Sequence, residues 1–254
     1  MNFELPHIPK RTTTPREGGL TMVMDKGLSI NEAKNMIAAS SKHIDIVKLG
    51  FGTAYLTEDL EEKIKLYSDA GFKVYFGGTL FEAFIARDMF NEFVELVEKF
   101  KLNTVEVSDG SIELEHDKKC EYIRILSKKV TVLSEIGSKS ADVLIPPYKW
   151  ILMMEKELAA GSWKVIAEAR EGGNVGICTG TGEVRSDLIE EILTKIPKEK
   201  ILWEAPQKSQ QVWFIKLMGA NVNLGNIAPN EVIPLECLRL GLRGDTFFDF
   251  LPTK

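Results

Sequence analysis

The chain repeats one pattern eight times: an apolar run of strand length, a polar turn, and a segment whose apolar residues have helical spacing. The expected strands are residues 20–24, 44–47, 73–76, 104–107, 130–136, 164–167, 201–203 and 221–224. Strands that alternate with helices pair in parallel through right-handed crossovers. Eight such units in 254 residues predict the α/β class and a single (β/α)₈ TIM barrel.

A doubly wound open sheet is the alternative architecture. It would normally need fewer units and a phosphate-binding fingerprint after the first strand, where this chain reads Asp25-Lys26-Gly27. Residues 1–18 are rich in proline, threonine and mixed charge, so we expect an N-terminal arm there and the barrel in residues 19–254.

Two expected helices begin with the spacing of a capping box. Ser29 and Glu32 open the helix that follows the first strand. Thr79 and Glu82 show the same spacing, and we expect a long helix from there to about Phe100.

The bulk composition limits the partners and the compartment. The net charge of −5 argues against nucleic acid as a partner, because phosphate binding usually shows as a basic stripe. The three cysteines are far apart and form no CxxC pair, which favours a reducing compartment. No apolar run approaches the length of a membrane span, and no apolar stretch follows a basic start in the N-terminal residues. A cytoplasmic protein without a membrane partner is expected.

Ionisable or amide side chains mark most of the expected strand ends. They are Asp25, Lys48, Glu106, Asp109, Glu135, Lys139, Glu168, Arg170, Glu204, Asn223 and Asn226. In a barrel these ends converge on one mouth, where active sites of this fold lie. Carboxylates together with cations at that address indicate a metal beside anion-binding groups.

Hard oxygen ligands without a histidine cluster favour Mg²⁺ over zinc. The candidate ligands are Glu106, Glu135, Glu168 and Glu204, with Asp25 as a further one, and the sequence does not rank them. There is no HExxH motif and no plausible Ser-His-Asp set, which argues against nucleophilic hydrolysis.

Phosphate sites in such barrels often use the loops after the seventh and eighth strands. These loops offer polar candidates for substrate binding: Gln207, Lys208, Ser209, Asn223, Asn226 and, at the same rim, Arg243. The glycine-rich loop 172–182 is either a lid or a flexible connection.

Taken together, the strand ends resemble those of the phosphosulfolactate synthase family. The matching stretches are GLTMVMDKG (19–27), VKLGFGT (47–53), KVYFGGTLFE (73–82), VEVSDGS (105–111), EAPQKSQQV (204–212), VNLGNIA (222–228) and GLRGDTF (241–247). They occur in order along nearly the whole chain.

The resemblance implies Mg²⁺-dependent addition of sulfite to phosphoenolpyruvate, which gives (2R)-2-O-phospho-3-sulfolactate. In methanogens this step opens coenzyme M synthesis, and some bacteria make sulfolactate by it. It also implies a catalytic lysine, for which Lys139 is the candidate general acid. Lys48, Arg170, Lys208 and Arg243 would then hold phosphate and sulfonate oxygens.

Two segments depart from the family pattern. The family often reads E-V-G-K-K where this chain has Glu135-Ile136-Gly137-Ser138-Lys139, so the second lysine alone is kept. The loop after the sixth strand keeps its charges in residues 168–173 but differs in its small residues. Stretches 137–147 and 172–185 match the family least, so a difference in substrate specificity is expected there.

Two other functions stay open at this stage. One is another phosphoenolpyruvate or phosphosugar lyase or isomerase on the same barrel, for which Lys48 could form a Schiff base. The other is a non-catalytic relative, since plant members act in heat-stress memory. Apolar residues at Leu28, Ile30, Phe247, Phe248 and Phe250 are candidates for subunit contacts, and we expect a homo-oligomer.

Overall fold

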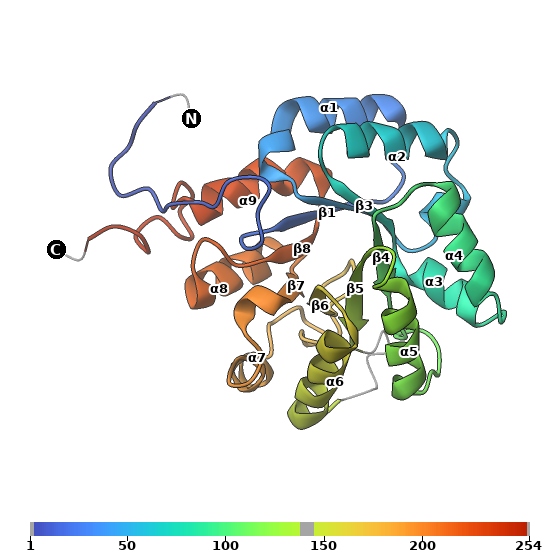
Figure 1. Cartoon of the computed structure of the whole chain (residues 1–254). Coiled ribbons are helices and arrows are strands. Elements are labelled where there is room, and N and C mark those ends of the chain that lie inside the picture. Colours follow the sequence, from blue (N-terminus) through green and yellow to red (C-terminus); the bar gives the residue numbers. More distant parts are fainter. Residues whose placement is uncertain (1–2, 138–144, 253–254) are drawn as a thin grey trace.

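The computed structural model describes residues 3–137 and 145–252, and in this part of the chain eight strands alternate with helices (Figure 1). The strands are β1 (Thr21–Asp25), β2 (Ile46–Leu49), β3 (Lys73–Phe76), β4 (Thr104–Val107), β5 (Thr131–Ile136), β6 (Lys164–Ala167), β7 (Ile201–Glu204) and β8 (Leu224–Ile227). The α-helices are α1 (Ile30–Ser40), α2 (Leu60–Asp69), α3 (Gly78–Ile85), α4 (Phe90–Lys99), α5 (His116–Leu126), α6 (Pro147–Ala160), α7 (Ser186–Leu193), α8 (Lys208–Met218) and α9 (Val232–Arg239).

The strands form one parallel sheet in the order β3-β2-β1-β8-β7-β6-β5-β4. The two ends of this order, β3 and β4, pack side by side, so the sheet curls into a nearly closed barrel. The helices surround the strands as an outer ring (Figure 1). This arrangement confirms the (β/α)₈ barrel over the doubly wound sheet.

The strands are buried on both faces, and each face has its own core. Outward side chains such as Val47 and Leu49 pack with the helices in the larger cluster. Inward side chains, among them Met22, Tyr75 and Ile166, form a separate cluster inside the barrel. Because side chains alternate along a strand, the inward position nearest each carboxyl end forms a further layer above this inner core. That layer carries the charged residues described below.

Strand β8 and one helix differ from the prediction. Strand β8 begins at Leu224 rather than Asn221, because the preceding residues form a turn in which Val222 N–H donates to the carbonyl of Gly219. The long helix expected to reach Phe100 is two helices, α3 and α4. The chain turns between them at Asp88, whose φ of 57° is left-handed and cannot continue a helix.

Only one of the two predicted capping boxes is present. The Ser29–Glu32 box is confirmed, with Glu32 N–H donating to the Ser29 hydroxyl and Ser29 N–H to the Glu32 carboxylate. The Thr79–Glu82 box is wrong, because α3 begins at Gly78 and Glu82 is buried instead, accepting a hydrogen bond from Ser108.

The N-terminal arm binds across the amino ends of the strands, away from the charged layer. Arg11 pairs with Glu236 of α9 at 2.9 Å, and Arg16 pairs with Asp45, which precedes β2, at the same distance. In the described ranges 3–137 and 145–252, no helix is both long and apolar enough to span a membrane.

Candidate active site at the barrel mouth

A cavity of about 260 Å³ opens at the carboxyl ends of the strands. Its lining includes Lys48, Glu106, Glu135, Glu168, Glu204, Arg170 and Asn226. The structure thus brings together four of the five predicted carboxylates and three of the predicted anion-binding groups. These residues lie together because the strands are parallel and the last inward position of several strands is charged.

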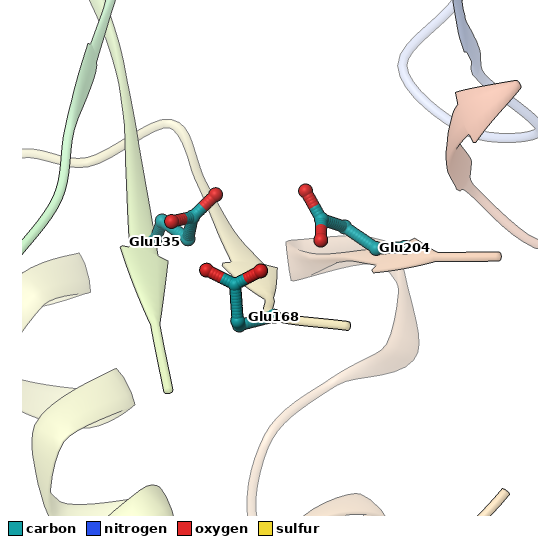
Figure 2. A group of neighbouring side chains, drawn as sticks. All are labelled: Glu135, Glu168 and Glu204. Atoms are coloured by element: carbon teal, nitrogen blue, oxygen red, sulfur yellow. The ribbon is translucent and has the colours of Figure 1, made fainter. Parts of the chain in front are cut away.

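Three of the glutamates lie on adjacent strand ends. Glu135 ends the inward row of β5, Glu168 directly follows β6, and Glu204 ends β7. Figure 2 shows their carboxylates turned toward one another, and one oxygen from each lies within 4.8 Å of the others. All three side chains are buried. We refer to them as the acidic triad.

The acidic triad fits a hard divalent cation. Two carboxylates at this separation repel by roughly 3 kcal/mol at an effective dielectric of about 20. Three mutual repulsions in a buried site favour a bound cation. Carboxylate oxygens are the ligands that Mg²⁺ and Ca²⁺ prefer, with metal–oxygen distances of about 2.0–2.6 Å, so the oxygens could converge on one ion directly or through its waters.

Lys48 lies beside the acidic triad and is almost fully buried. Its Nζ is 3.0 Å from Glu106 Oε2, 3.3 Å from Glu135 Oε2 and 3.4 Å from Glu204 Oε1. Burial by itself lowers the pKa of Lys48, but the three carboxylates outweigh it and hold that pKa well above its ordinary value. Lys48 is therefore an ammonium that neutralises carboxylates, and its contact with substrate oxygens stays a prediction.

Glu106 is held by the start of α3. Its Oε1 accepts a 2.6 Å hydrogen bond from Gly78 N–H, at the positive end of the helix dipole. A Cβ at residue 78 would overlap both Glu106 Oε1 and the Ser108 hydroxyl, so this close approach requires glycine.

The loop after β6 joins two members of the acidic triad. Arg170 N–H donates to Glu168 Oε1 at 2.6 Å and to Glu204 Oε2 at 2.9 Å, and Ala169 N–H also donates to Glu204. Arg170 adopts a left-handed φ of 62°, which aims its N–H at both carboxylates. Strained conformations of this kind are common where a site must be held in one geometry.

Asp25 does not join the acidic triad. Its carboxylate accepts N–H groups from Gly27 and Leu28 at 2.7 Å, accepts the Tyr67 hydroxyl at 2.9 Å and pairs with Lys63 at 3.2 Å. Tyr67 and Lys63 belong to α2, so Asp25 faces the outer helices and serves as a buried structural ion pair. The prediction of Asp25 as a metal ligand is not supported by this placement.

Asn223 lies at the opposite end of the barrel from the cavity. Its amide nitrogen donates to the carbonyls of Ile201 and Glu199, and its oxygen accepts Leu20 N–H at 3.0 Å. These partners surround the amino ends of β1 and β7. The expected substrate role for Asn223 rested on the misplaced start of β8, and the residue fastens strands instead.

The predicted phosphate-binding residues near α8 lie at the rim and outside the cavity. Lys208 is half-exposed and pairs with Asp245 at 2.9 Å, while Ser209 is exposed in the first turn of α8. Gln207 donates to the carbonyl of Gly172, and Arg243 is half-buried beyond β8. Substrate contacts by these four residues remain predictions.

Gln210 is a buried residue that the sequence analysis did not select. Its amide nitrogen donates to the carbonyls of Gly173 and Gly182, and its oxygen accepts Gln207 N–H. It therefore ties the glycine-rich loop 172–182 to the start of α8. The Q-x-x-Q spacing of residues 207 and 210, which here forms a capping box, was the available signal.

A second missed residue, Lys119 of α5, supports the triad from behind. Its buried Nζ donates to the main-chain carbonyl of Glu135 at 2.5 Å and pairs with Asp109 at 2.8 Å and Glu157 at 2.9 Å. Lys119 thus joins α5, α6 and the loop after β4 to the strand end that bears Glu135. A lysine on a helix is usually solvated, so the sequence contains no clear signal for this role.

The predicted general acid, Lys139, lies outside the described residues, as does its neighbour Ser138. The described residues stop at Gly137 on the N-terminal side of this segment. Gly137 has a φ of 139° and lies so close to the Glu168 side chain that there is no space for a Cβ. The assignment of Lys139 therefore stays a prediction.

The chain is similar to known proteins in sequence and in fold. A family model described as (2R)-phospho-3-sulfolactate synthase matches residues 9–245. The chain is 41% identical to the phosphosulfolactate synthase of Bacillus subtilis (98% of this chain, 100% of the relative) and 40% identical to that of Methanothermobacter thermautotrophicus (94% and 95%). It is also 22% identical to the Arabidopsis thaliana protein HEAT-STRESS-ASSOCIATED 32, with 59% and 58% covered.

Among solved structures, 3-hexulose-6-phosphate synthase from Salmonella typhimurium superposes with a TM-score of 0.58. The match covers 88% of this chain and 100% of that one, at 13% sequence identity. At this identity the likeness concerns the barrel fold alone.

Proposed function

The chain belongs to the phosphosulfolactate synthase family, and from that premise we propose that it joins sulfite to phosphoenolpyruvate to form (2R)-2-O-phospho-3-sulfolactate. It is an enzyme of that type, and its substrates and metal are the proposed part. The observation that carries the proposal is the acidic triad, buried beside Lys48 and Arg170 at the barrel mouth. This site combines a cation-binding cluster with groups suited to anions.

The reaction creates negative charge at one place. The sulfur lone pair of sulfite attacks the CH₂ carbon of phosphoenolpyruvate and forms the C–S bond, while the C=C electrons move toward C2 and the carboxylate. A proton then reaches C2 to complete the product. Most of the activation free energy comes from forming the enediolate-like dianion that precedes this proton transfer. The site must therefore stabilise negative charge at the substrate carboxylate.

Glu135, Glu168 and Glu204 are the residues that would hold Mg²⁺. A bound divalent cation would supply positive charge beside the carboxylate, where the negative charge develops. Lys48 keeps the cluster from excess negative charge, and the main-chain N–H of Arg170 fixes two of the three carboxylates. Glu106, the fourth candidate, is occupied with Lys48 and Gly78, which favours a supporting role.

The direct test is an assay with purified enzyme, phosphoenolpyruvate, sulfite and Mg²⁺, followed by ³¹P NMR and mass spectrometry. We expect a phosphate ester that contains a new C–S bond, and no product when either substrate is omitted. Exhaustive chelation should abolish turnover, and added Mg²⁺ should restore it. Failure to form the ester would contradict the proposed reaction, whereas full activity after chelation would contradict the metal alone.

Replacing Lys139 by alanine should lower kcat by about a hundredfold and change KM little, because general acid catalysis contributes in the transition state. The measurement is steady-state kinetics with each substrate varied in turn. Lys149→Ala, at an exposed position on α6, is the matched control and should behave as wild type. A rise in KM at constant kcat would make Lys139 a binding group.

The Schiff-base alternative predicts a different result with borohydride. A Schiff base needs a neutral amine, but Lys48 is held as an ammonium by three carboxylates at 3.0–3.4 Å. Phosphoenolpyruvate has no aldehyde or ketone, so the trapping uses pyruvate or a phosphosugar that carries one. We expect no covalent adduct after borohydride reduction with either compound, as judged by intact-protein mass spectrometry. An adduct that maps to Lys48 would instead favour the lyase or isomerase reaction.

The remaining expectations depend on this function. A homo-oligomer in the cytoplasm stays a prediction, with Phe247 and Phe248 exposed and Phe250 packed against the core. The heat-stress alternative would be favoured by loss of charged groups at the mouth, but this chain retains them. The step that consumes the product, toward coenzyme M or sulfolactate, must come from other enzymes.

A further inference from the structure

Strand β8 contains a bulge at the barrel mouth. Its pairing with β1 runs from Thr21 opposite Leu224 to Val23 opposite Ile227, so β8 uses one residue more than β1 over the same length. Asn226 lies inside this bulge with a left-handed φ of 56°. Asparagine tolerates that conformation better than most residues do. Bulges of this kind often redirect a side chain beside an active site.

The bulge places Asn226 in the lining of the cavity, together with Lys48 and the acidic triad. The residue is 4% exposed, and neither its Oδ1 nor its Nδ2 has a hydrogen-bond partner in the part of the chain that the structure describes. Buried polar side chains are nearly always hydrogen-bonded, because an unmade bond costs free energy. A buried amide without a partner, on a residue that lines a cavity, therefore indicates a ligand.

The same residue type a few positions earlier behaves differently. Asn223 is also buried, but both ends of its amide are bonded to main-chain groups, those of Leu20, Glu199 and Ile201. Asn223 thus has a complete structural role at the amino ends, and Asn226 has none at the mouth. This contrast separates an asparagine that fastens strands from one that faces a ligand.

The charge of the cavity indicates which kind of ligand atom the Asn226 amide would bind. Glu106, Glu135, Glu168 and Glu204 all line the cavity, and three of these carboxylates already share the ammonium of Lys48. The proposed substrates are both oxyanions, so they need further donors in this acidic mouth. An asparagine amide supplies two N–H donors without adding charge.

We infer that Asn226 Nδ2 donates a hydrogen bond to an oxyanion of the substrates, and that the β8 bulge exists to aim it. This inference rests on the proposed function and adds a specificity residue to it. The oxyanion belongs either to phosphoenolpyruvate or to sulfite, and kinetics with each substrate varied separately distinguishes the two.

The test uses the full-length enzyme with Mg²⁺ and three variants. Asn226→Gly keeps the left-handed backbone and removes the amide, Asn226→Asp replaces the donor by a carboxylate, and Asn223→Ala is the matched structural control. The readouts are Tm, the Kd of phosphoenolpyruvate by calorimetry without sulfite, and KM for each substrate.

We expect both Asn226 variants to keep a Tm near that of wild type. Both variants should bind one of the two substrates at least about tenfold more weakly, because one hydrogen bond to a charged group is lost. The loss of affinity should be larger in Asn226→Asp. A higher Kd for phosphoenolpyruvate assigns the oxyanion to that substrate, and a higher KM for sulfite alone assigns it to sulfite. Asn223→Ala should show the reverse pattern, a lower Tm with nearly unchanged substrate affinity.

Three results would overturn the inference. The first is a lower Tm in Asn226→Gly with both substrates bound as in wild type, which would make Asn226 structural. The second is Asn226→Asp with tighter Mg²⁺ binding and unchanged substrate affinity, which would make the amide oxygen a cation ligand. The third is a wild-type enzyme that neither binds nor turns over phosphoenolpyruvate, in which case the proposed function fails as well.

Discussion

Replacing Glu168 by glutamine should lower kcat/KM by about a thousandfold while the barrel stays folded. The substitution keeps the size of the side chain and an oxygen that can accept Arg170 N–H, but it removes one of three charges from the acidic triad. Loss of one charge-stabilising group in an active site commonly costs a factor of about 10²–10³, and a metal ligand lies at the upper end. Steady-state kinetics at saturating Mg²⁺ measures the effect.

The thermal response to Mg²⁺ tells a lost metal ligand from a misfolded protein. A ligand that binds the native state raises Tm in proportion to its affinity, so the wild-type enzyme should be stabilised by Mg²⁺. Glu168→Gln should lose most of that shift, yet its Tm without metal should equal or exceed that of wild type, because mutual repulsion within the triad is weaker. Glu190→Gln, at an exposed position on α7, is the control. Retained activity with a retained Mg²⁺ shift would remove Glu168 from the metal site.

The convergence of these carboxylates was predictable from the sequence because it depends on few facts. Glu106, Glu135 and Glu204 each lie at or one residue before the end of a run of strand length, and parallel strands in a barrel share one carboxyl end. The order and spacing of the eight units therefore suffice to predict a shared mouth. Their mutual distances and the ion pairs with Lys48 needed the structure, because they depend on strand register.

The direction of a side chain was harder to predict than its position along a strand. Asp25 ends β1 as Glu204 ends β7, but it lies on the outward side and pairs with Lys63. The preceding residues Met22, Val23 and Met24 are apolar on both faces, as expected in a parallel sheet, so no alternation in the sequence reveals which face is inside. The outward direction of Asp25 follows from tertiary packing alone.

The eighth strand shows a second limit. Residues 221–224 alternate between polar and apolar side chains as a strand would. The turn at Gly219 nevertheless delays strand pairing until Leu224. That delay moves Asn223 to the amino end and gives the mouth position to Asn226. A bulge and a left-handed residue are not encoded by apolar periodicity, so periodicity could not predict them.

Replacing Lys48 by methionine should have a large effect of a different kind. Methionine has a similar length, but it leaves Glu106, Glu135 and Glu204 without the ammonium that they share. Removing one partner from a buried ion-pair cluster typically costs about 3–5 kcal/mol. For a chain of this size that corresponds to a fall in Tm of roughly 6–20 °C without metal. Activity should fall by about a thousandfold, because the carboxylates no longer keep their arrangement.

The response of Lys48→Met to Mg²⁺ should be opposite to that of Glu168→Gln. With the ammonium absent, the surplus of negative charge should draw a cation more strongly, so Mg²⁺ should raise Tm by more than it does in wild type. Activity should not return, since the restored charge is displaced from the position of Nζ. Lys42→Met, at an exposed position before β2, is the control and should match wild type in both measurements. If Lys48→Met and wild type had the same Tm and the same Mg²⁺ shift, Lys48 would not balance the charge of the acidic triad, and the cation site would have to lie elsewhere.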